Sequence, residues 1–316
     1  MTRPSSGRLR AGARKRMLTL ATMAVGASLA VMMLASPAFA EPKGIFKVFN
    51  DCPVEVPGNA LCSFAQTTSG EFAIGSTKVP ITKTITLQGG AVHTGGPNEN
   101  EYFLLPAKDG NSLSKTELNV PGGLLDFVNC EEIKGSGFFE SLERLTCKAI
   151  FENKTTGVTA TTELVANMSN PAILNLVGLA FEEGTALTLP VRVHLKNPLL
   201  GEECYIGSES SPIQLHLTTG TTKPPLPNKP IKGSGGTFIE ETEKGQILIS
   251  VAGNSLVDNA FSVPVATGCG GFFSFLIDPI VDGKLGLPSV AGKNTAILSG
   301  TLKTAETSAV LASEKF

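Results

Sequence analysis

Leu187-Thr-Leu-Pro-Val-Arg-Val-His-Leu195 is the stretch that decides the fold class, because apolar and polar residues alternate along it. Its odd-numbered residues are all Leu or Val, whereas Thr188, Arg192 and His194 are polar. A period of two predicts a β-strand with one face on a core and the other in water. That arrangement is typical of antiparallel sheets rather than parallel ones.

Further segments with the same alternation lie on both sides of this stretch. They are residues 79–88, 158–165, 213–217, 246–251 and 295–302. Gly, Pro, Ser and Thr are abundant between them, and charged residues make up only 17% of the chain. Short alternating segments separated by turn residues predict an all-β protein, built mainly of antiparallel β-sandwich or barrel units.

Helical patterns are few. Residues 137–145 carry Phe and Leu at helical spacing, with acidic residues and Arg144 on the opposite side. Asn170-Pro171 would begin a second short helix that runs to Phe181, although that stretch fits a strand almost as well. We therefore expect one or two short helices.

The first forty residues have the three parts of a secretion signal. Six basic residues and no acidic one lie between positions 3 and 16, residues 17–34 are almost wholly apolar, and Ala38-Phe39-Ala40 follows. This order predicts a signal peptide over 1–40 that is cleaved after Ala40, and the arginine-rich start favours a bacterial one. The alternative is a retained anchor, because eighteen apolar residues would just span a bilayer.

Cleavage would change the charge of the protein. It removes six of the 26 basic residues and none of the 28 acidic ones, which leaves a mature net charge of −8. A negative surface repels phosphate backbones and anionic headgroups, so we expect no nucleic-acid partner. No later segment is long and apolar enough to span a membrane, so we expect no transmembrane segment after signal cleavage.

The cysteines are even in number and lie after the predicted signal. They are Cys52, Cys62, Cys130, Cys147, Cys204 and Cys269. In an oxidising compartment such a set predicts three disulfides. The C-x-x-C spacing of many zinc and redox sites does not occur. Free, buried cysteine at one or two positions is the alternative.

Six cysteines allow 15 pairings. Nearest-neighbour spacing favours a short loop closed by Cys52–Cys62, and for the rest we expect Cys147–Cys204 and Cys130–Cys269. Residues 223–236 are rich in Pro and Gly, and only Cys269 lies beyond them. If every cysteine is bonded, one bridge must cross this segment.

The predicted organisation follows from these features. After the signal peptide at 1–40, we expect a first β unit at 41–120 and a second β unit at 121–316. The second unit includes the Pro-rich crossing segment 223–236.

Motifs for hydrolysis are weak. No G-x-S-x-G occurs, and Ser112-Leu-Ser-Lys115 matches the S-x-x-K spacing without its S-D-N and K-T-G companions. The match lies in a polar stretch that is typical of a loop. Acidic pairs occur near residues 131, 182, 202 and 240, and we expect them in solvated turns and strand ends. We expect no catalytic site and no enzymatic activity.

A metal site depends on the register of two strands. His194 and His216 would be neighbours on one polar face if their strands paired in a suitable register, and would share a metal with a third ligand. The alternative is two solvent-facing positions. No third ligand is evident, so we expect neither a metal nor a cofactor.

Aromatic residues favour cores rather than sugar binding. Trp is absent and Tyr occurs twice, which disfavours a lectin, whereas 17 Phe are present. The stretch from Gly268 to Phe275 is the most unusual, with Cys269 between glycines and three Phe after it. We expect a core strand anchored by its disulfide, and a groove for an apolar ligand is the alternative.

These observations favour a secreted, non-enzymatic β protein of structural or interaction type, either extracellular or a component of the cell envelope. A β protein that binds an apolar ligand such as a lipid is the first alternative. A secreted hydrolase with a carboxylate site outside the known motifs is the second.

Overall fold

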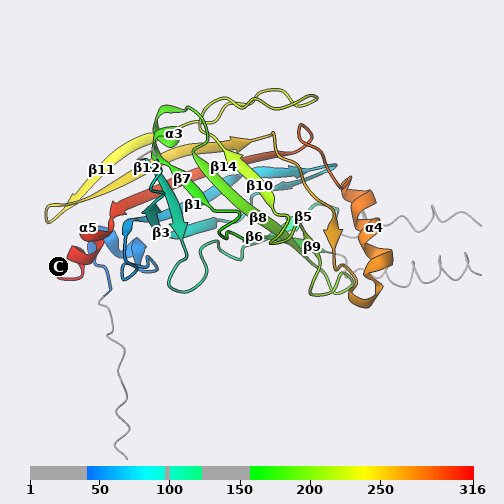
Figure 1. The fold of residues 1–316 in the computed structure, drawn as a ribbon, viewed down its shortest axis with the longest axis horizontal. Coiled ribbons are helices and arrows are strands. Elements are labelled where there is room, and N and C mark those ends of the chain that lie inside the picture. The colour runs from blue at the N-terminus through cyan, green and yellow to red at the C-terminus, as the bar shows by residue number, and fades with distance from the viewer. Residues whose placement is uncertain (1–40, 97–99, 123–156) are drawn as a thin grey trace, which may run out of the picture. The chain divides into compact units, whose positions relative to one another are not determined.

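In the computed structural model, which describes residues 41–96, 100–122 and 157–316, the alternating stretch forms strand β8 (Leu187–Lys196). Figure 1 shows β8 crossing the middle of the fold. Leu187, Leu189, Val191 and Leu195 are buried, as the period of two predicts. The prediction of a mainly antiparallel β protein with disulfides is confirmed.

Fourteen strands form one sheet among the described residues, in the order β11-β12-β14-β1-β3-β4-β7-β8-β6-β5, with β2, β9, β10 and β13 branching from it. Besides β8, the strands are β1 (Asn59–Ile74), β2 (Thr77–Pro80), β3 (Ile85–His93), β4 (Glu101–Leu105), β5 (Glu117–Val120), β6 (Val158–Leu164), β7 (Ile173–Asn175), β9 (Tyr205–Ile206), β10 (Ile213–Leu217), β11 (Thr237–Glu243), β12 (Gln246–Asp258), β13 (Ala266–Thr267) and β14 (Thr295–Glu306). Each predicted strand segment overlaps at least one of them, and the segment 79–88 is divided between β2 and β3, with residues 81–84 in neither.

Helices in the described residues are short. They are η1 (Gly44–Phe49), α3 (Leu176–Phe181), η3 (Gly271–Phe273), α4 (Ser274–Leu285) and α5 (Thr307–Ser313). The stretch from Asn170 to Phe181, for which a helix and a strand both fitted, contains both, because β7 leads directly into α3. The helix predicted at 137–145 lies outside the described residues. None of the described helices combines the length and hydrophobicity needed to cross a bilayer.

Strands from the two expected β units are hydrogen-bonded to each other. β1, which we placed in the unit 41–120, pairs along most of its length with β14, which we placed in the unit 121–316. The sheet also returns on itself. The N–H of Thr218 after β10 donates to the carbonyl of Val257 in β12 at 2.9 Å, and the N–H of Val257 donates to the carbonyl of Thr218 at 2.8 Å. The largest core cluster therefore joins residues from β8 and β10 with residues such as Leu298 of β14.

Two disulfides are present in the described residues. Cys52–Cys62 is confirmed. Cys204 pairs with Cys269, so the expected pairs Cys147–Cys204 and Cys130–Cys269 are wrong. Cys130 and Cys147 themselves lie outside the described residues. The inference that one bridge crosses the segment 223–236 is confirmed, because Cys204 and Cys269 lie on either side of it.

The expected core strand after Cys269 is wrong, because this stretch turns into η3 and α4. Ile277, Val281 and Leu285 recur every four residues and pack on the core, which a helix satisfies and a strand does not. Two carboxylates hold the helix in place. Asp278 accepts the backbone N–H of Cys269 at 2.7 Å, and Asp282 accepts that of Ala266 at 2.7 Å.

Two β-bulges face the same residue of β14. β1 gains an extra residue at Thr68 and β12 gains one at Gly253, and both irregularities lie opposite Gly300. A Cβ on Gly300 would collide with the carbonyl of Gln66 in β1. The close approach of these two strands therefore requires glycine at position 300.

Removing each disulfide tests how the chain is cross-linked. The Cys204–Cys269 bridge spans 65 residues and Cys52–Cys62 spans 10, so their loops contribute about 4 and about 3 kcal/mol to stability in the chain-entropy description. We expect the double variant C204A/C269A to lose more free energy of unfolding in urea than C52A/C62A. A larger loss from C52A/C62A would contradict this.

Gly300→Ala tests the contact between β14 and β1. We expect a loss of about 1–3 kcal/mol, because either strand must move to admit the methyl group. Gly283→Ala is the matched control. Nothing lies within 4 Å of a Cβ at Gly283 in α4, so alanine should raise stability by roughly 0.5–1 kcal/mol there. Urea unfolding of both variants measures the difference, and equal effects would count against the proposed conflict.

Candidate functional site

A pocket lies where the two parts of the sheet separate. β7 is only three residues long, yet it is the strand that joins β4 to β8, through pairs such as Phe103 with Ile173 and Leu174 with Leu187. On β8, the partner strand changes from β7 at Thr188 to β6 at Val191. β3 and β4 follow a different path from β6, and the space between them is open.

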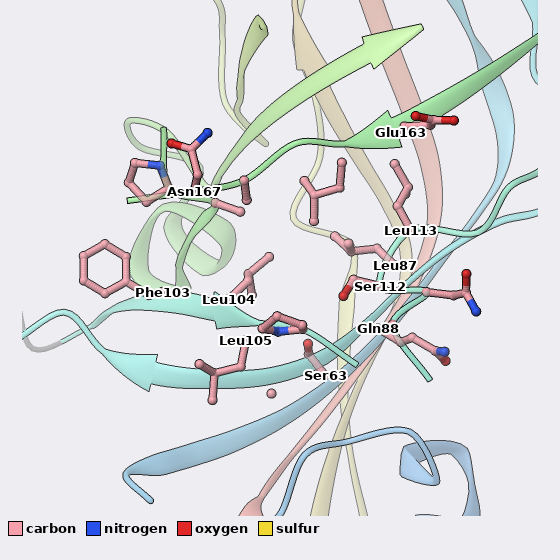
Figure 2. Close-up of a pocket in the computed structure, with 18 of the residues that line it drawn as sticks. Ser63, Leu87, Gln88, Phe103, Leu104, Leu105, Ser112, Leu113, Glu163 and Asn167 are labelled. Carbon is pink, nitrogen blue, oxygen red and sulfur yellow. The ribbon is translucent and has the colours of Figure 1, made fainter. Parts of the chain in front are cut away.

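We call this space the fork pocket. Its volume is about 870 Å³, which is within the range of small-molecule sites. Its apolar lining comes from both sides of the fork, and Figure 2 shows several of these side chains. The apolar residues are Leu87, Phe103, Leu104, Leu105, Pro106, Leu113, Leu164, Ala166, Met168, Pro171 and Ala172. The Met168 side chain is fully exposed at the pocket.

Part of the fork pocket is lined by a charged pair with an aromatic ring. Nε of Arg192 donates to Oε2 of Glu163 at 2.8 Å, and Nη2 lies 2.8 Å from the same oxygen. The guanidinium carbon of Arg192 is 4.2 Å from the centre of the Tyr205 ring. The His194 ring stacks on Tyr205, with 4.4 Å between their centres.

Strand register explains why these four residues meet. Glu163 of β6 is directly opposite Arg192 of β8, and Tyr205 of β9 is directly opposite His194. Arg192 and His194 are two residues apart, so their side chains leave the same face of β8. Burial raises the pKa of the Tyr205 hydroxyl, and the Glu163 carboxylate raises it further.

His194 does not face solvent, although its position on the polar side of the strand made exposure the alternative expectation. Its side chain is buried, and Nδ1 lies 3.5 Å from Oε1 of Glu163. His194 and Thr161 are directly opposite each other in β8 and β6, and Nε2 of His194 and Oγ1 of Thr161 are buried without a hydrogen-bond partner in the described part of the chain. Both oxygens of Glu163 are thus engaged, one by Arg192 and the other beside His194.

The structure does not bring His194 and His216 together. Their strands β8 and β10 do pair, but His216 is opposite Thr188, six residues before His194. At about 3.3 Å per residue, that offset separates the two positions by roughly 20 Å. Nowhere in residues 41–96, 100–122 and 157–316 do three or more metal-ligating side chains gather.

The S-x-x-K match does not have a helical arrangement. Residues 112–115 form an irregular loop in which Leu113 bridges to Leu87. Oγ of Ser112 accepts the backbone N–H of Ala107 at 2.9 Å. Ser112 and Lys115 both line the fork pocket, although the spacing did not predict a pocket.

The acidic pairs have mainly structural contacts. Glu182 accepts the backbone N–H of Gly235 at 3.1 Å, and Glu243 accepts that of Ile45 at 2.7 Å. The pair at residues 131 and 132 lies outside the described residues. Among the described residues that line the fork pocket, Glu163 is the single carboxylate.

Comparison with known proteins found no match among protein-family models, curated proteins or solved structures. The choice of the fork pocket as the candidate site therefore depends on its geometry alone.

Glu163→Gln tests whether the charged pair stabilises the pocket wall. Arg192 and Glu163 are 26% and 20% exposed, so we expect the variant to lose about 1.5–3 kcal/mol of unfolding free energy. Glu117→Gln is the matched control, because the Lys196–Glu117 pair of the same sheet face is 2.9 Å long but 39% and 44% exposed. Solvent screening should limit its loss to less than about 1 kcal/mol.

The stability that the Lys196–Glu117 pair contributes depends on pH. Lys196 lowers the pKa of Glu117, so any stability from that pair is present at neutral pH and is lost as the pH falls through the lowered pKa. Denaturation of both variants at pH 7, above the lowered pKa of Glu117, compares their losses. A loss from Glu117→Gln that equals that from Glu163→Gln would show that burial does not decide the contribution.

Proposed function

We propose that this chain is a secreted, non-enzymatic β protein that binds the apolar part of a ligand in the fork pocket, outside the cell or in the cell envelope. The observation that carries the proposal is a pocket of about 870 Å³ in which about half of the described lining residues are aliphatic or aromatic. Apolar surface that lines a concave site gains free energy when a ligand removes it from water.

The proposed location rests on the start of the chain and on the cysteines. The basic, apolar and small-residue regions before residue 41 are typical of an export signal. Two disulfides are consistent with an oxidising environment. A bacterial source is supported only by the arginine-rich start of that signal.

The contacts in the pocket favour binding over catalysis. The single described carboxylate of its lining, Glu163, is held by Arg192, whereas glycoside hydrolysis needs a pair of carboxylates. Ser112 accepts a backbone N–H, and among the described lining residues neither a histidine nor a helical lysine lies next to it.

The interior of the sheet is less suited to a ligand than the fork pocket. Two cavities inside the core have volumes of about 50 Å³ each and are lined by packed side chains such as Val120, Leu195 and Leu298. A volume of that size holds little more than a water molecule or two. A lipid-sized ligand would therefore enter the fork pocket.

The binding of N-phenyl-1-naphthylamine, a neutral apolar dye whose fluorescence rises in apolar surroundings, tests the proposal. We expect saturable binding to the protein, and a roughly tenfold weaker affinity for Ala166→Trp, because the indole would fill part of the pocket. Ala166 is exposed at the pocket, so the variant should fold. Ala180→Trp is the matched control on α3, where an exposed alanine lies outside the pocket lining.

Two results would refute the proposed function. The first is a dye titration without saturation. The second is equal binding by Ala166→Trp, Ala180→Trp and the unaltered protein, since the dye would then bind elsewhere.

A further inference from the structure

Charge is unevenly distributed in the fork pocket. Lys115 and Arg192 are the cationic residues of the described lining, and Glu163 is its anionic residue, so the lining has a net charge of +1. The mature chain as a whole is acidic, as its composition requires. The pocket is therefore a local exception to the sign of the protein's charge.

Glu163 is not available to a cationic ligand. Oε2 accepts from Nε of Arg192 and lies 2.8 Å from Nη2, and Oε1 is 3.5 Å from Nδ1 of His194. A cation that entered the pocket would have to compete with a guanidinium already in place. Competition with a fixed charge-assisted pair is unfavourable.

Arg192 keeps donors for a second acceptor. A guanidinium has five N–H groups, and the contacts with Glu163 use one on Nε and one on Nη2. The group is held in position by the carboxylate and by the Tyr205 ring, 4.2 Å away. A donor group fixed in this way loses little conformational entropy when a ligand binds.

Lys115, in the loop before β5, provides a second cation in the pocket lining. Its loop is anchored by the N–H of Ser114, which donates to the carbonyl of Thr86 at 2.8 Å, and by the bridge between Leu113 and Leu87. In Figure 2, Leu113 and Glu163 lie toward the same side of the pocket, and Phe103 lies toward the other. Within the described part of the chain, the Lys115 ammonium forms no ion pair within 4 Å.

We propose that the fork pocket binds an amphiphile with an anionic head, either a carboxylate or a phosphate monoester, whose head contacts Lys115 and Arg192 and whose chain lies along the Leu and Phe side chains. This inference rests on the proposed function, because it needs the pocket to hold an apolar chain. It adds the sign of the charge on the ligand's head group and the residues that select this charge.

Four ligands with the same twelve-carbon chain separate the head from the chain. Dodecanoate, dodecyl phosphate, dodecanol and dodecyltrimethylammonium each compete with N-phenyl-1-naphthylamine for the purified protein, below their micelle concentrations. We expect the two anions to bind roughly tenfold more tightly than dodecanol, and the cation to bind least tightly. The order of dodecanoate and dodecyl phosphate identifies which anion the pocket prefers.

Lys115→Gln measures how much the contact between the anionic head and Lys115 contributes to affinity. Lys115 is exposed, so the variant should fold, and we expect its affinity for the anions to fall roughly fivefold. Dodecanol should bind the variant as tightly as it binds the unaltered protein. Lys223→Gln is the control for the loss of one positive charge outside the pocket lining, and should change none of the affinities.

The outcomes distinguish the two proposals. Equal affinity for dodecanol and dodecanoate, or unchanged anion binding by Lys115→Gln, would overturn the anionic-head inference while the apolar pocket stands. Failure of all four ligands to displace the dye would overturn both.

Discussion

Strand β8 is the constraint on which the rest of the structure depends, because its two edges are divided among four partners. β10 and β9 pair along one edge, and β7 and β6 follow each other along the other edge. Each partner pairs with only part of β8, so the same ten residues set the register of all four pairs. The change from β7 to β6 near Thr188 is what opens the sheet beside the strand. The fork pocket is thus a consequence of how hydrogen bonds are shared along one strand.

Alternation predicted where the strands lie because it reflects burial, which acts locally. The segments at 187–195, 213–217 and 295–302 are strands for that reason. The same reasoning fails after Cys269, where it predicts that three Phe side chains lie in the core. Phe272 is 89% exposed, and the buried face of α4 is made by residues farther along, with Asp278 as an anchor for the loop before it. Disulfide pairing failed similarly, because β9 and β13 bring Cys204 and Cys269 together across the sheet, and a pairing between two-residue strands leaves no pattern in the sequence.

The site was less predictable than the fold. The polar face of β8, with Arg192 and His194, was evident from the sequence, but their partners were not. Glu163 is 29 residues from Arg192, and it reaches Arg192 only through the register of β6 with β8. Tyr205 lies on a separate strand, β9, which begins directly after Cys204. The alternation of apolar and polar residues at 158–165 gave a clue, because it places Glu163 on the polar side of its strand. Its opposite neighbour could not be identified without the register.

The paired bulges opposite Gly300 mark the level at which the sheet bends. Bulges bend a strand and increase its local twist, and here two of them lie at the same level on either side of β14. The apolar side chains at the two ends of β1 and β14 belong to different clusters, and Val251 and Leu302 near the bulges belong to a third. Before it in β1 and after it in β14, residues such as Cys62 and Ala305 pack with η1 and α5, whereas Phe72 and Leu298 pack in the main core. Three continuous strands thereby supply side chains both to the main core and to the cluster that packs the segments at the two ends of residues 41–316 together, and that cluster needs no strands of its own.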